Sequence, residues 1–424
     1  MSQGEDLIKR APPDQLQPWF ARATALPPGR AAIIGGGIAG ASTAHALRRR
    51  GWQTTIIDRR KELAQEASGN PTGVLMPRLT AAPNLDGRFY AAAWRFVLRT
   101  LVDIGMQLDA GGVLQLATDA AEAARQNMVA ADAALPPAML RQMDAAAASD
   151  IAGCALPFGA LHFPQGGAID PRAYCAALAQ GSDVLFGVDV ARLRHDGRWQ
   201  VIDAAGEVRT EVDIVVLANA LGAASLPQTA WLPLAARRGA LTLAPPTPAS
   251  AALRAVLAYG GYMTPARGGV HSIGATFDWI SAHELNAPPV VRGDDHARNL
   301  ADLAHVLPGL MAGVEPRALA GRAALRCTTA DHMPVVGPVP DEGAYRSDFA
   351  ELRHGHPWAR YPGARYVPGL YVLTGLGARG LVSAPLAAEI LAAHVTGESW
   401  PVENDLTTAL HPGRFLVREL KRGI

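Results

Sequence analysis

The sequence predicts an α/β protein, α+β overall, in which a domain built on a parallel sheet is interleaved with one built on an antiparallel sheet. Residues 31–58 show the pattern strand, glycine turn, helix and strand, and residues 369–395 show a strand, a glycine-rich turn and a helix. Between them, residues 231–280 alternate apolar and polar side chains, which is typical of antiparallel strands. Because the parallel-sheet segments stand at both ends of the chain, we expect the chain to cross repeatedly between two domains.

The chain has 424 residues, which suits about two or three domains. Prolines break regular structure in the first 30 residues, although Trp19 and Phe20 are expected to pack onto the body of the protein. The expected division is a linker at 1–30, a discontinuous nucleotide-binding domain at 31–110, 160–230 and 320–424, and a substrate domain at 111–159 and 231–319.

Composition indicates a globular protein without strong charge. Hydrophobic residues make up 49% and charged residues 18%, so a large core can form, and the formal net charge is +1. This balance neither favours nor excludes a nucleic-acid partner, because a local basic patch is sufficient. The three cysteines form no CxxC pair, no apolar run is long enough to span a membrane, and residues 1–30 lack a signal peptide. We therefore expect a cytoplasmic protein with reduced thiols.

The elements of the nucleotide-binding domain follow in order. We expect a strand at 31–34, a helix at 38–50, a strand at 53–57 and a further buried strand at 213–217, then a strand at 369–374 and a helix at 384–395. Elsewhere we expect helices at 88–108, 119–148 and 294–307, and strands at 184–190 and 199–203. Residues 61–80 are expected to be rich in loops, and residues 345–365 to form an insertion loop of the kind that often carries binding residues.

The strongest motif is Gly35-x-Gly37-x-x-Gly40, which follows the first strand and opens the first helix, so that Ile38 and Ala39 start the helix. These glycines permit a tight turn, close approach of a pyrophosphate and close packing of helix on strand. The free N–H groups of the helix start attract phosphate. Asp58, at the end of the second strand, can accept hydrogen bonds from a ribose and so disfavours a 2′-phosphate. Arg59 and Arg60 follow it, so NADP is not excluded. The segment therefore predicts a Rossmann-like dinucleotide site, without deciding between FAD and NAD.

A second glycine-rich turn, Gly375-Leu-Gly377-Ala-Arg379-Gly380-Leu381, precedes the last long helix. Its helix N-terminus can receive an electron-rich ring edge, such as a pyrimidine carbonyl of a flavin. The loop Ser68-Gly69-Asn70-Pro71-Thr72-Gly73 reads, on composition alone, as an ordinary turn.

Taken in order, these segments resemble the D-amino-acid-oxidase-like family of FAD-dependent amine oxidases, over about residues 31–395. The matching stretches are IIGGGIAGASTAHALRRRGWQTTIID, EASGNPTG, GGAIDPRAYCAAL, DIVVLANA, ALRCTTADHMPVVGP and GLGARGLVSAPLAAEILA. The resemblance implies FAD, reoxidation by molecular oxygen and a Rossmann-like domain interleaved with an antiparallel substrate domain. We expect the FAD to be noncovalent, because no Cys or His stands at a recognised attachment motif. The resemblance also implies cofactor contacts at Gly35, Gly37, Ile38, Ala39, Gly40, Asp58, Arg59, Ser68, Gly69, Asn70, Gly73, Val190, Ala218, Asn219, Gly377, Ala378, Arg379, Gly380 and Leu381.

A closer resemblance is to the oxidase half of the MnmC family of bacterial bifunctional tRNA-modification enzymes. It rests on PWFAR, ASGNPTGVLMPRLT and ALHPGRFLVRELKRG. It implies oxidation of the carboxymethylaminomethyl group of the wobble (2-thio)uridine in tRNA, which releases glyoxylate and leaves the aminomethyl uridine. The methyltransferase half of that family has no counterpart in this sequence, so we expect no methylation step and no site for its methyl donor.

A carboxylate-bearing substrate favours an arginine fork. Arg326 matches the position at which relatives that oxidise glycine-like substrates bind carboxylate, and Arg379 is the second candidate. Arg238 and Tyr262 are weaker candidates in the antiparallel layer. The basic candidates for tRNA contact are Arg414, Arg418, Lys421 and Arg422, together with Arg353, His354, His356, Arg360 and Arg365 interleaved with Trp358 and Tyr361. No histidine spacing indicates a metal.

Two alternatives stay open from the sequence. One is an oxidase of a small amine or amino acid, of the glycine or sarcosine type. The other is a tRNA-binding flavoprotein without turnover, which Arg326 and the two glycine-rich turns disfavour. Bleaching of the bound flavin by tRNA, by free amino acids or by neither would separate the three.

Overall fold

The computed structural model describes residues 17–423 except 83, 110, 133–134 and 282–283. Residues 1–16 of the expected linker lie outside this range. Within it, Pro18–Phe20 form a short 3-10 helix, η1, whose Trp19 and Phe20 are 5% and 1% exposed and pack against the C-terminal helices. This confirms the expectation that the two aromatic residues pack onto the body.

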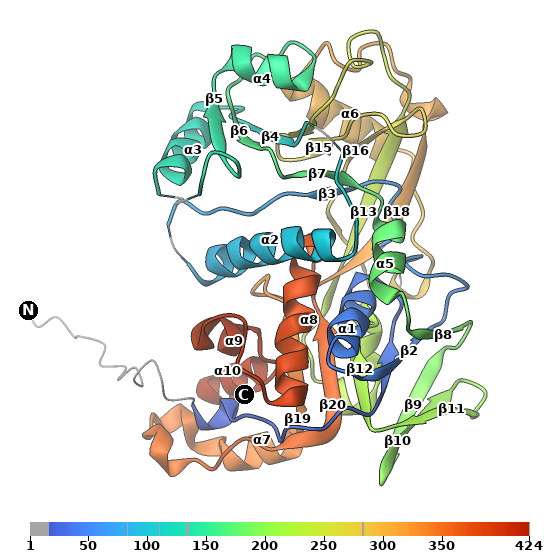
Figure 1. The fold of residues 1–424 in the computed structure, drawn as a ribbon, viewed down its shortest axis with the longest axis vertical. Helices are drawn as coiled ribbons and strands as arrows, with labels where there is room; N and C mark the ends of the chain where they lie inside the picture. The colour runs from blue at the N-terminus through green and yellow to red at the C-terminus, as the bar shows by residue number, and fades with distance from the viewer. Residues whose placement is uncertain (1–16, 83, 110, 133–134, 282–283, 424) are drawn as a thin grey trace, which may run out of the picture.

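A mixed sheet, mostly parallel, forms the lower part of the molecule (Figure 1). Its strands run in the order β19 (Val335–Pro340), β20 (Tyr366–Thr374), β12 (Ile214–Leu217), β1 (Arg30–Ile34), β2 (Gln53–Asp58) and β8 (Asp183–Phe186). All neighbouring pairs are parallel except β19 with β20. We call this the parallel sheet. Its central strands β1 and β12 are nearly continuously apolar and buried, because both faces of the sheet are covered there.

Helices cover one face of the parallel sheet and a small antiparallel sheet covers the other. The helices are α1 (Ile38–Arg48), α5 (Pro171–Ala179) and α8 (Gly380–Thr396), with α2 (Leu85–Asp103) packed on α8. On the other face, Trp199 and Val201 pack with Ile34 and Ile57 in one apolar cluster. They come from the sheet of β9 (Val190–Asp196), β10 (Arg198–Asp203) and β11 (Val208–Val212).

A second, larger sheet forms the upper part of the molecule, and we call it the large sheet. Its strands are β17 (Asp278–Trp279), β13 (Ala235–Ala244), β16 (His271–Gly274), β15 (Tyr262–Met263), β14 (Val256–Ala258), β4 (Val113–Leu116), β6 (Ala160–Phe163) and β5 (Arg141–Met143), in that order, with β18 (Ala320–Thr328) paired to β13. Helices α3 (Ala120–Asp132), α4 (Ala145–Ala152) and α6 (Asp295–Val306) accompany it. A small ladder of β3 (Gly73–Leu75) and β7 (Gly167–Ile169) lies beside it, and α7 (Glu342–Asp348), α9 (Asn404–Leu410) and α10 (Arg414–Arg422) complete the lower part.

Three expectations are corrected by this arrangement. The domain limits at 160 and 320 are wrong because β6 pairs with β4 and β5, and β18 pairs along its length with β13, so both strands belong to the large sheet. The single helix expected at 119–148 is broken, because Pro136 and Pro137 interrupt it and β5 pairs with β6. The insertion loop expected at 345–365 is largely helical, because it buries Tyr345, Phe349 and Leu352.

Candidate functional site

The turn between β1 and α1 requires glycine at two positions. Gly35 has φ of +110°, and a Cβ there would lie 2.6 Å from the carbonyl oxygen of Ala218. A Cβ on Gly40 would lie only 1.8 Å from the carbonyl oxygen of Gly35. The motif therefore brings the start of α1 directly against the ends of β1 and β12, as the sequence predicted.

Polar side chains far along the sequence also meet this turn. The carboxylate of Asp58 accepts the N–H of Gly36 at 2.5 Å and that of Arg60 at 2.7 Å. The hydroxyl of Ser68 accepts the N–H of Ile38 at 3.0 Å, at the otherwise uncapped start of α1. Two predicted cofactor residues thus lie at the N-terminus of the helix, where an anion is stabilised.

The second glycine-rich turn lies beside the first. Its Gly377 has φ of +57° and donates its N–H to the carbonyl of Cys327 at 2.8 Å. A Cβ on Gly380 would contact Ile38 at 3.2 Å, and a Cβ on Gly73 would overlap Leu381 at 2.3 Å. The structure therefore brings the expected segments 35–40, 68–73 and 377–381 together, with α1 packed against α8.

We call the segments 35–40, 68–73 and 377–381 the glycine cradle, and the end of β12 forms its remaining side. Asn219 has a buried side-chain oxygen with no hydrogen-bond partner among the described residues, and Ala220 has φ of +54°. A buried acceptor of this kind calls for a donor from outside the chain, and a polyhydroxylated cofactor supplies one. Glycine positions that admit no Cβ, a helix start and an unpartnered acceptor together fit a dinucleotide cofactor.

Two predicted cofactor residues lie at the margin of the cradle. Val190 begins β9 and packs partly buried with the apolar cluster of Ile34. Two residues earlier, the N–H of Val188 donates to the carbonyl of Asp58 at 3.1 Å. The side chain of Arg59 pairs with Glu66 at 2.9 Å. The contacts of these two side chains, Val190 and Arg59, therefore do not indicate a role in binding a cofactor.

The sequence prediction missed Arg322, on β18. This guanidinium donates to the side-chain oxygen of Asn70 at 2.9 Å, to the carbonyl of Gln65 at 2.8 Å and to the carbonyl of Glu66. Burial lowers the pKa of Arg322 from its ordinary value, and its hydrogen bonds go to neutral oxygens. Arg322 therefore fixes the 65–70 loop. Arg322 stands four residues before Arg326, and this spacing puts both side chains on one face of a strand. That spacing is the sequence signal that could have identified Arg322.

Arg326 lies on the same strand and has the properties of an anion site. It is half-buried, donates from Nη1 to the carbonyl of Thr276 at 3.0 Å, and stacks on Gly239, where a Cβ would lie 2.0 Å from Nη1. No carboxylate pairs with it among the residues that the structure describes, and burial lowers its pKa. Tyr262 lies close enough to interact electrostatically, and burial raises the pKa of its phenol to about 12, so the hydroxyl stays protonated. The free guanidinium edge can bind a carboxylate bidentately.

Arg379, the second candidate, lies in the turn that leads into α8. It is half-buried, and its guanidinium carbon lies 5.9 Å from the ring centroid of Tyr90. Desolvation lowers its pKa. Because Gly377 bonds to Cys327, this turn is tied to the residue that follows Arg326. Both arginine candidates are thus close to the junction of the two glycine-rich turns with β18.

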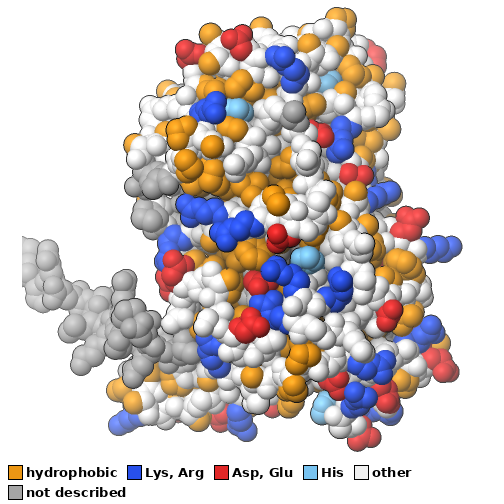
Figure 2. All heavy atoms as spheres, viewed as in Figure 1, with side chains coloured by type: hydrophobic (Ala, Val, Ile, Leu, Met, Phe, Trp, Pro, Cys, Tyr) orange, Lys and Arg blue, Asp and Glu red, His pale blue; other side chains and the backbone are white. Residues whose placement is uncertain are grey.

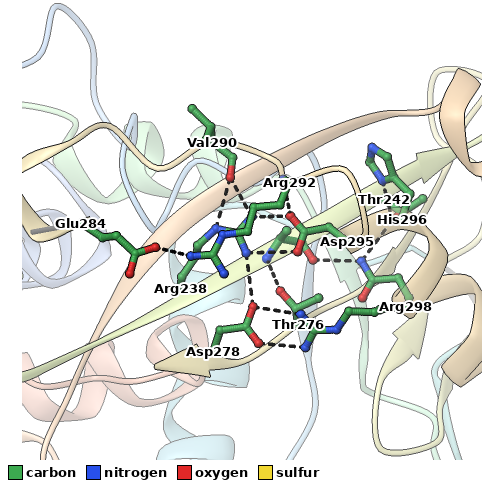
Figure 3. A network of polar contacts seen from close by, with 12 residues as sticks. Arg238, Thr242, Thr276, Asp278, Glu284, Val290, Arg292, Asp295, His296 and Arg298 are labelled. Carbon is green, nitrogen blue, oxygen red and sulfur yellow. Dashed lines mark hydrogen bonds and ion pairs between the residues drawn. The ribbon is translucent and has the colours of Figure 1, made fainter. Parts of the chain in front are cut away.

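Arg238 is not available for substrate, and that expectation is wrong. The side chain is buried and pairs with Asp295 and, at 3.3 Å, with Asp278. Figure 3 shows it at the centre of a polar network that joins β13 to α6, in which Arg298 also pairs with Asp278 at 2.8 Å. Strand alternation puts Arg238 on the face opposite Arg326 and Arg237, so its role is structural.

The basic residues expected to contact tRNA fall into two groups. Arg414 is buried and pairs with Asp331 at 2.9 Å, so the expectation for this residue is wrong. The others lie around α7 and α10 at the lower end of the molecule, where Lys421 lies over the ring of Trp358 at 5.3 Å. On the face of the molecule drawn in Figure 2, Lys and Arg side chains lie across the middle with Asp and Glu side chains beside them, so the charges there are mixed in sign.

Two features are absent from the described residues. Within them, no helix is both long and apolar enough to cross a membrane. Nor do three or more His, Cys, Asp or Glu side chains in that part of the chain come together as metal ligands would.

Comparison with known proteins identifies close relatives. The family model described as FAD dependent oxidoreductase matches residues 30–394. The chain is 40% identical over 402 residues to the tRNA 5-methylaminomethyl-2-thiouridine biosynthesis bifunctional protein MnmC of Methylobacillus flagellatus, covering 92% of this chain and 60% of that protein. It is 41% identical to the protein of the same description from Pseudomonas aeruginosa, covering 96% and 62%. The chain thus spans about three fifths of the length of these curated relatives.

Solved structures share the fold. Iminodiacetate oxidase from Chelativorans sp. superposes with a TM-score of 0.68 at 25% identity, covering 88% of this chain and 97% of that one. Glycine oxidase from Geobacillus kaustophilus superposes with a TM-score of 0.67 at 19% identity, covering 90% and 98%. At that identity the second likeness concerns the fold alone.

Proposed function

The chain belongs to the FAD dependent oxidoreductase family, and from this premise we propose that it oxidises the carboxymethylaminomethyl group of a wobble uridine or 2-thiouridine in tRNA. The observation that carries the proposal is Arg326, a half-buried arginine without a carboxylate partner among the described residues, which lies beside the glycine cradle. The relatives described as MnmC support the tRNA substrate. Iminodiacetate, the substrate named for one structural neighbour, is a secondary amine that carries carboxymethyl groups, as the proposed substrate does.

In this proposal FAD is held by residues of the glycine cradle. The first turn of α1 and Ser68 face the pyrophosphate, Asp58 the ribose and Asn219 a hydroxyl of the cofactor. The turn before α8 would hold the flavin ring, and its helix N-terminus would favour negative charge there. Bound FAD supplies a two-electron acceptor for hydride from the carbon next to the amine nitrogen.

The residues of this chain orient the substrate for that oxidation. Arg326 binds the carboxylate of the carboxymethyl group and so fixes the adjacent carbon. The protonated phenol of Tyr262 can donate a hydrogen bond to the same carboxylate. Loss of hydride leaves an iminium between the glycine-derived carbon and nitrogen, and loss of its N–H proton to water gives the imine. Water adds to this imine and splits it into glyoxylate and the aminomethyl uridine, and molecular oxygen is the proposed final acceptor.

The test uses the purified holoenzyme without oxygen. We expect tRNA that carries the carboxymethylaminomethyl group to bleach the flavin and release one glyoxylate per flavin, whereas glycine, sarcosine and D-alanine do not. Bleaching by the free amino acids alone would support the second candidate, a small-molecule oxidase, and no bleaching by either would contradict both.

Replacement of Arg326 tests its proposed role in binding the substrate carboxylate. Arg326→Gln should lower kcat/KM for the modified tRNA by about 100-fold, the loss of a charge-assisted bidentate contact, while the FAD content stays unchanged. Arg326→Lys should recover part of the loss, because it keeps the charge and loses the fork. An unchanged kcat/KM in Arg326→Gln would contradict the assigned role.

A further inference from the structure

The segment from the end of β16 to the end of β17 exposes two large aromatic side chains. Phe277 is 49% exposed and Trp279 is 73% exposed, and they flank Asp278. Large aromatic residues at such exposure are a sign of a binding surface when they are clustered and held in place.

The polar network of Figure 3 holds this segment. Asp278 turns inward and pairs with Arg298 at 2.8 Å and with Arg238 at 3.3 Å. The hydroxyl of Thr276 accepts the N–H of Ala240 at 2.9 Å, and its carbonyl accepts Arg326. The backbone that carries the two aromatic residues is therefore held in place before any ligand binds, which reduces the entropic cost of binding.

Arg237 connects the two aromatic side chains with Arg326. It lies directly opposite Trp279 on β17 and directly opposite Arg326 on β18, so the three side chains share one face. The guanidinium of Arg237 stacks on the ring of Trp279 and lies 5.8 Å from the ring centroid of Phe277, while that of Arg326 lies 5.5 Å from the same centroid. A continuous row thus runs from the proposed carboxylate site to the surface. We call Phe277, Arg237 and Trp279 the aromatic ledge.

We propose that the aromatic ledge stacks nucleobases of a single-stranded RNA loop whose modified uridine places its carboxymethyl group at Arg326. The proposal rests on the proposed function and names the part of the site that recognises RNA. Every base has a π-face, so aromatic side chains stack on unpaired bases whatever their sequence. A cationic guanidinium behind the ring adds favourable electrostatics. A free amino acid held by Arg326 has no group that extends to Trp279, so the ledge distinguishes an anticodon loop from a small amine.

The experiment compares two substrates on the same holoenzyme variants. The first is an anticodon stem-loop RNA that carries the modified uridine, and the second is the free nucleoside 5-carboxymethylaminomethyluridine. Trp279→Ala should lower kcat/KM for the stem-loop about tenfold or more, the loss of one base stack, and change that for the nucleoside less than twofold. Trp279→Phe should keep most of the activity on RNA. The control Val102→Ala removes a side chain of similar exposure (78%) on α2 and should leave both substrates unaffected.

Binding of an unmodified stem-loop, followed by fluorescence anisotropy, separates this proposal from the proposed function. If the wild type binds the stem-loop through Trp279 but oxidises neither substrate, the proposed function fails and the ledge stands. If RNA is oxidised and Trp279→Ala and Phe277→Leu bind and turn it over like the wild type, the ledge is refuted, and a surface for another partner becomes the explanation. Equal losses on both substrates also refute it. Phe277→Leu keeps an apolar side chain and serves where Trp279→Ala does not fold.

Discussion

Arg322→Met should weaken FAD binding although this side chain is not itself one of the proposed FAD contacts. Arg322 donates three hydrogen bonds from β18 to the loop 65–70, one to Asn70 and two to backbone carbonyls. That loop carries Ser68, whose hydroxyl caps the start of α1 at Ile38. Without the guanidinium, the loop has to be ordered by the cofactor itself, and the cost of ordering lowers the apparent affinity.

The magnitude follows from the contacts. A hydrogen bond from a charged group contributes about 1.5–3 kcal/mol, and water replaces part of each lost bond in a half-buried side chain. A net loss of about 3 kcal/mol for the three bonds is therefore reasonable. Since about 1.4 kcal/mol corresponds to a factor of ten, the Kd for FAD should rise by about 100-fold.

The assay is titration of apoprotein with FAD, followed by quenching of flavin fluorescence. Arg317→Met, an exposed arginine in the short 3-10 helix that precedes β18, is the matched control and should bind FAD like the wild type. The Kd of Arg322→Lys for FAD should lie between those of the wild type and Arg322→Met, because lysine cannot reach all three acceptors at once. A Kd for Arg322→Met within threefold of the wild type would refute the reasoning, whatever the change in Tm.

Three further predictions concern other parts of the chain. Gly40→Ala should abolish the flavin absorbance of the purified protein, because its Cβ would lie 1.8 Å from a backbone oxygen, while Gly343→Ala, where the nearest atom lies at 3.6 Å, should keep it. Burial lowers the pKa of His394 to about 3 and that of His411 well below 6.5, so on acidification these histidines take up protons in the unfolded state before the folded state. The Tm should therefore fall as the pH drops from about 6.5 towards 3, and His394→Leu should make the Tm depend less on pH. A Tm independent of pH over this range would contradict the prediction. Arg238→Met leaves a buried carboxylate unpaired and should cost about 3–5 kcal/mol in the free energy of unfolding, measured by urea denaturation, whereas a loss below about 1 kcal/mol would show that the ion pair is dispensable.

Local signals account for what the sequence predicted well. The first glycine motif could be recognised because strand, turn and helix follow each other within thirty residues and each glycine has a steric reason. The antiparallel layer could be recognised from alternation along β13 to β16. By contrast, the pairing of β18 with β13 joins Arg326 to Arg237, 89 positions earlier, and no local pattern encodes such a partner. The domain limits at 160 and 320 were wrong for the same reason.

The sequence alone determined the first glycine turn and the helix start of the proposed cofactor site, because the conformational freedom of glycine and the free amides of a helix start are properties of short segments. Only the tertiary structure decided which arginines remain available for a ligand. Arg238 and Arg414 are neutralised by Asp295 and Asp331, which lie 57 and 83 residues away in the chain, whereas Arg326 meets no carboxylate among the described residues. Ion pairing depends on distance in space, and that distance is set only when both sheets have formed.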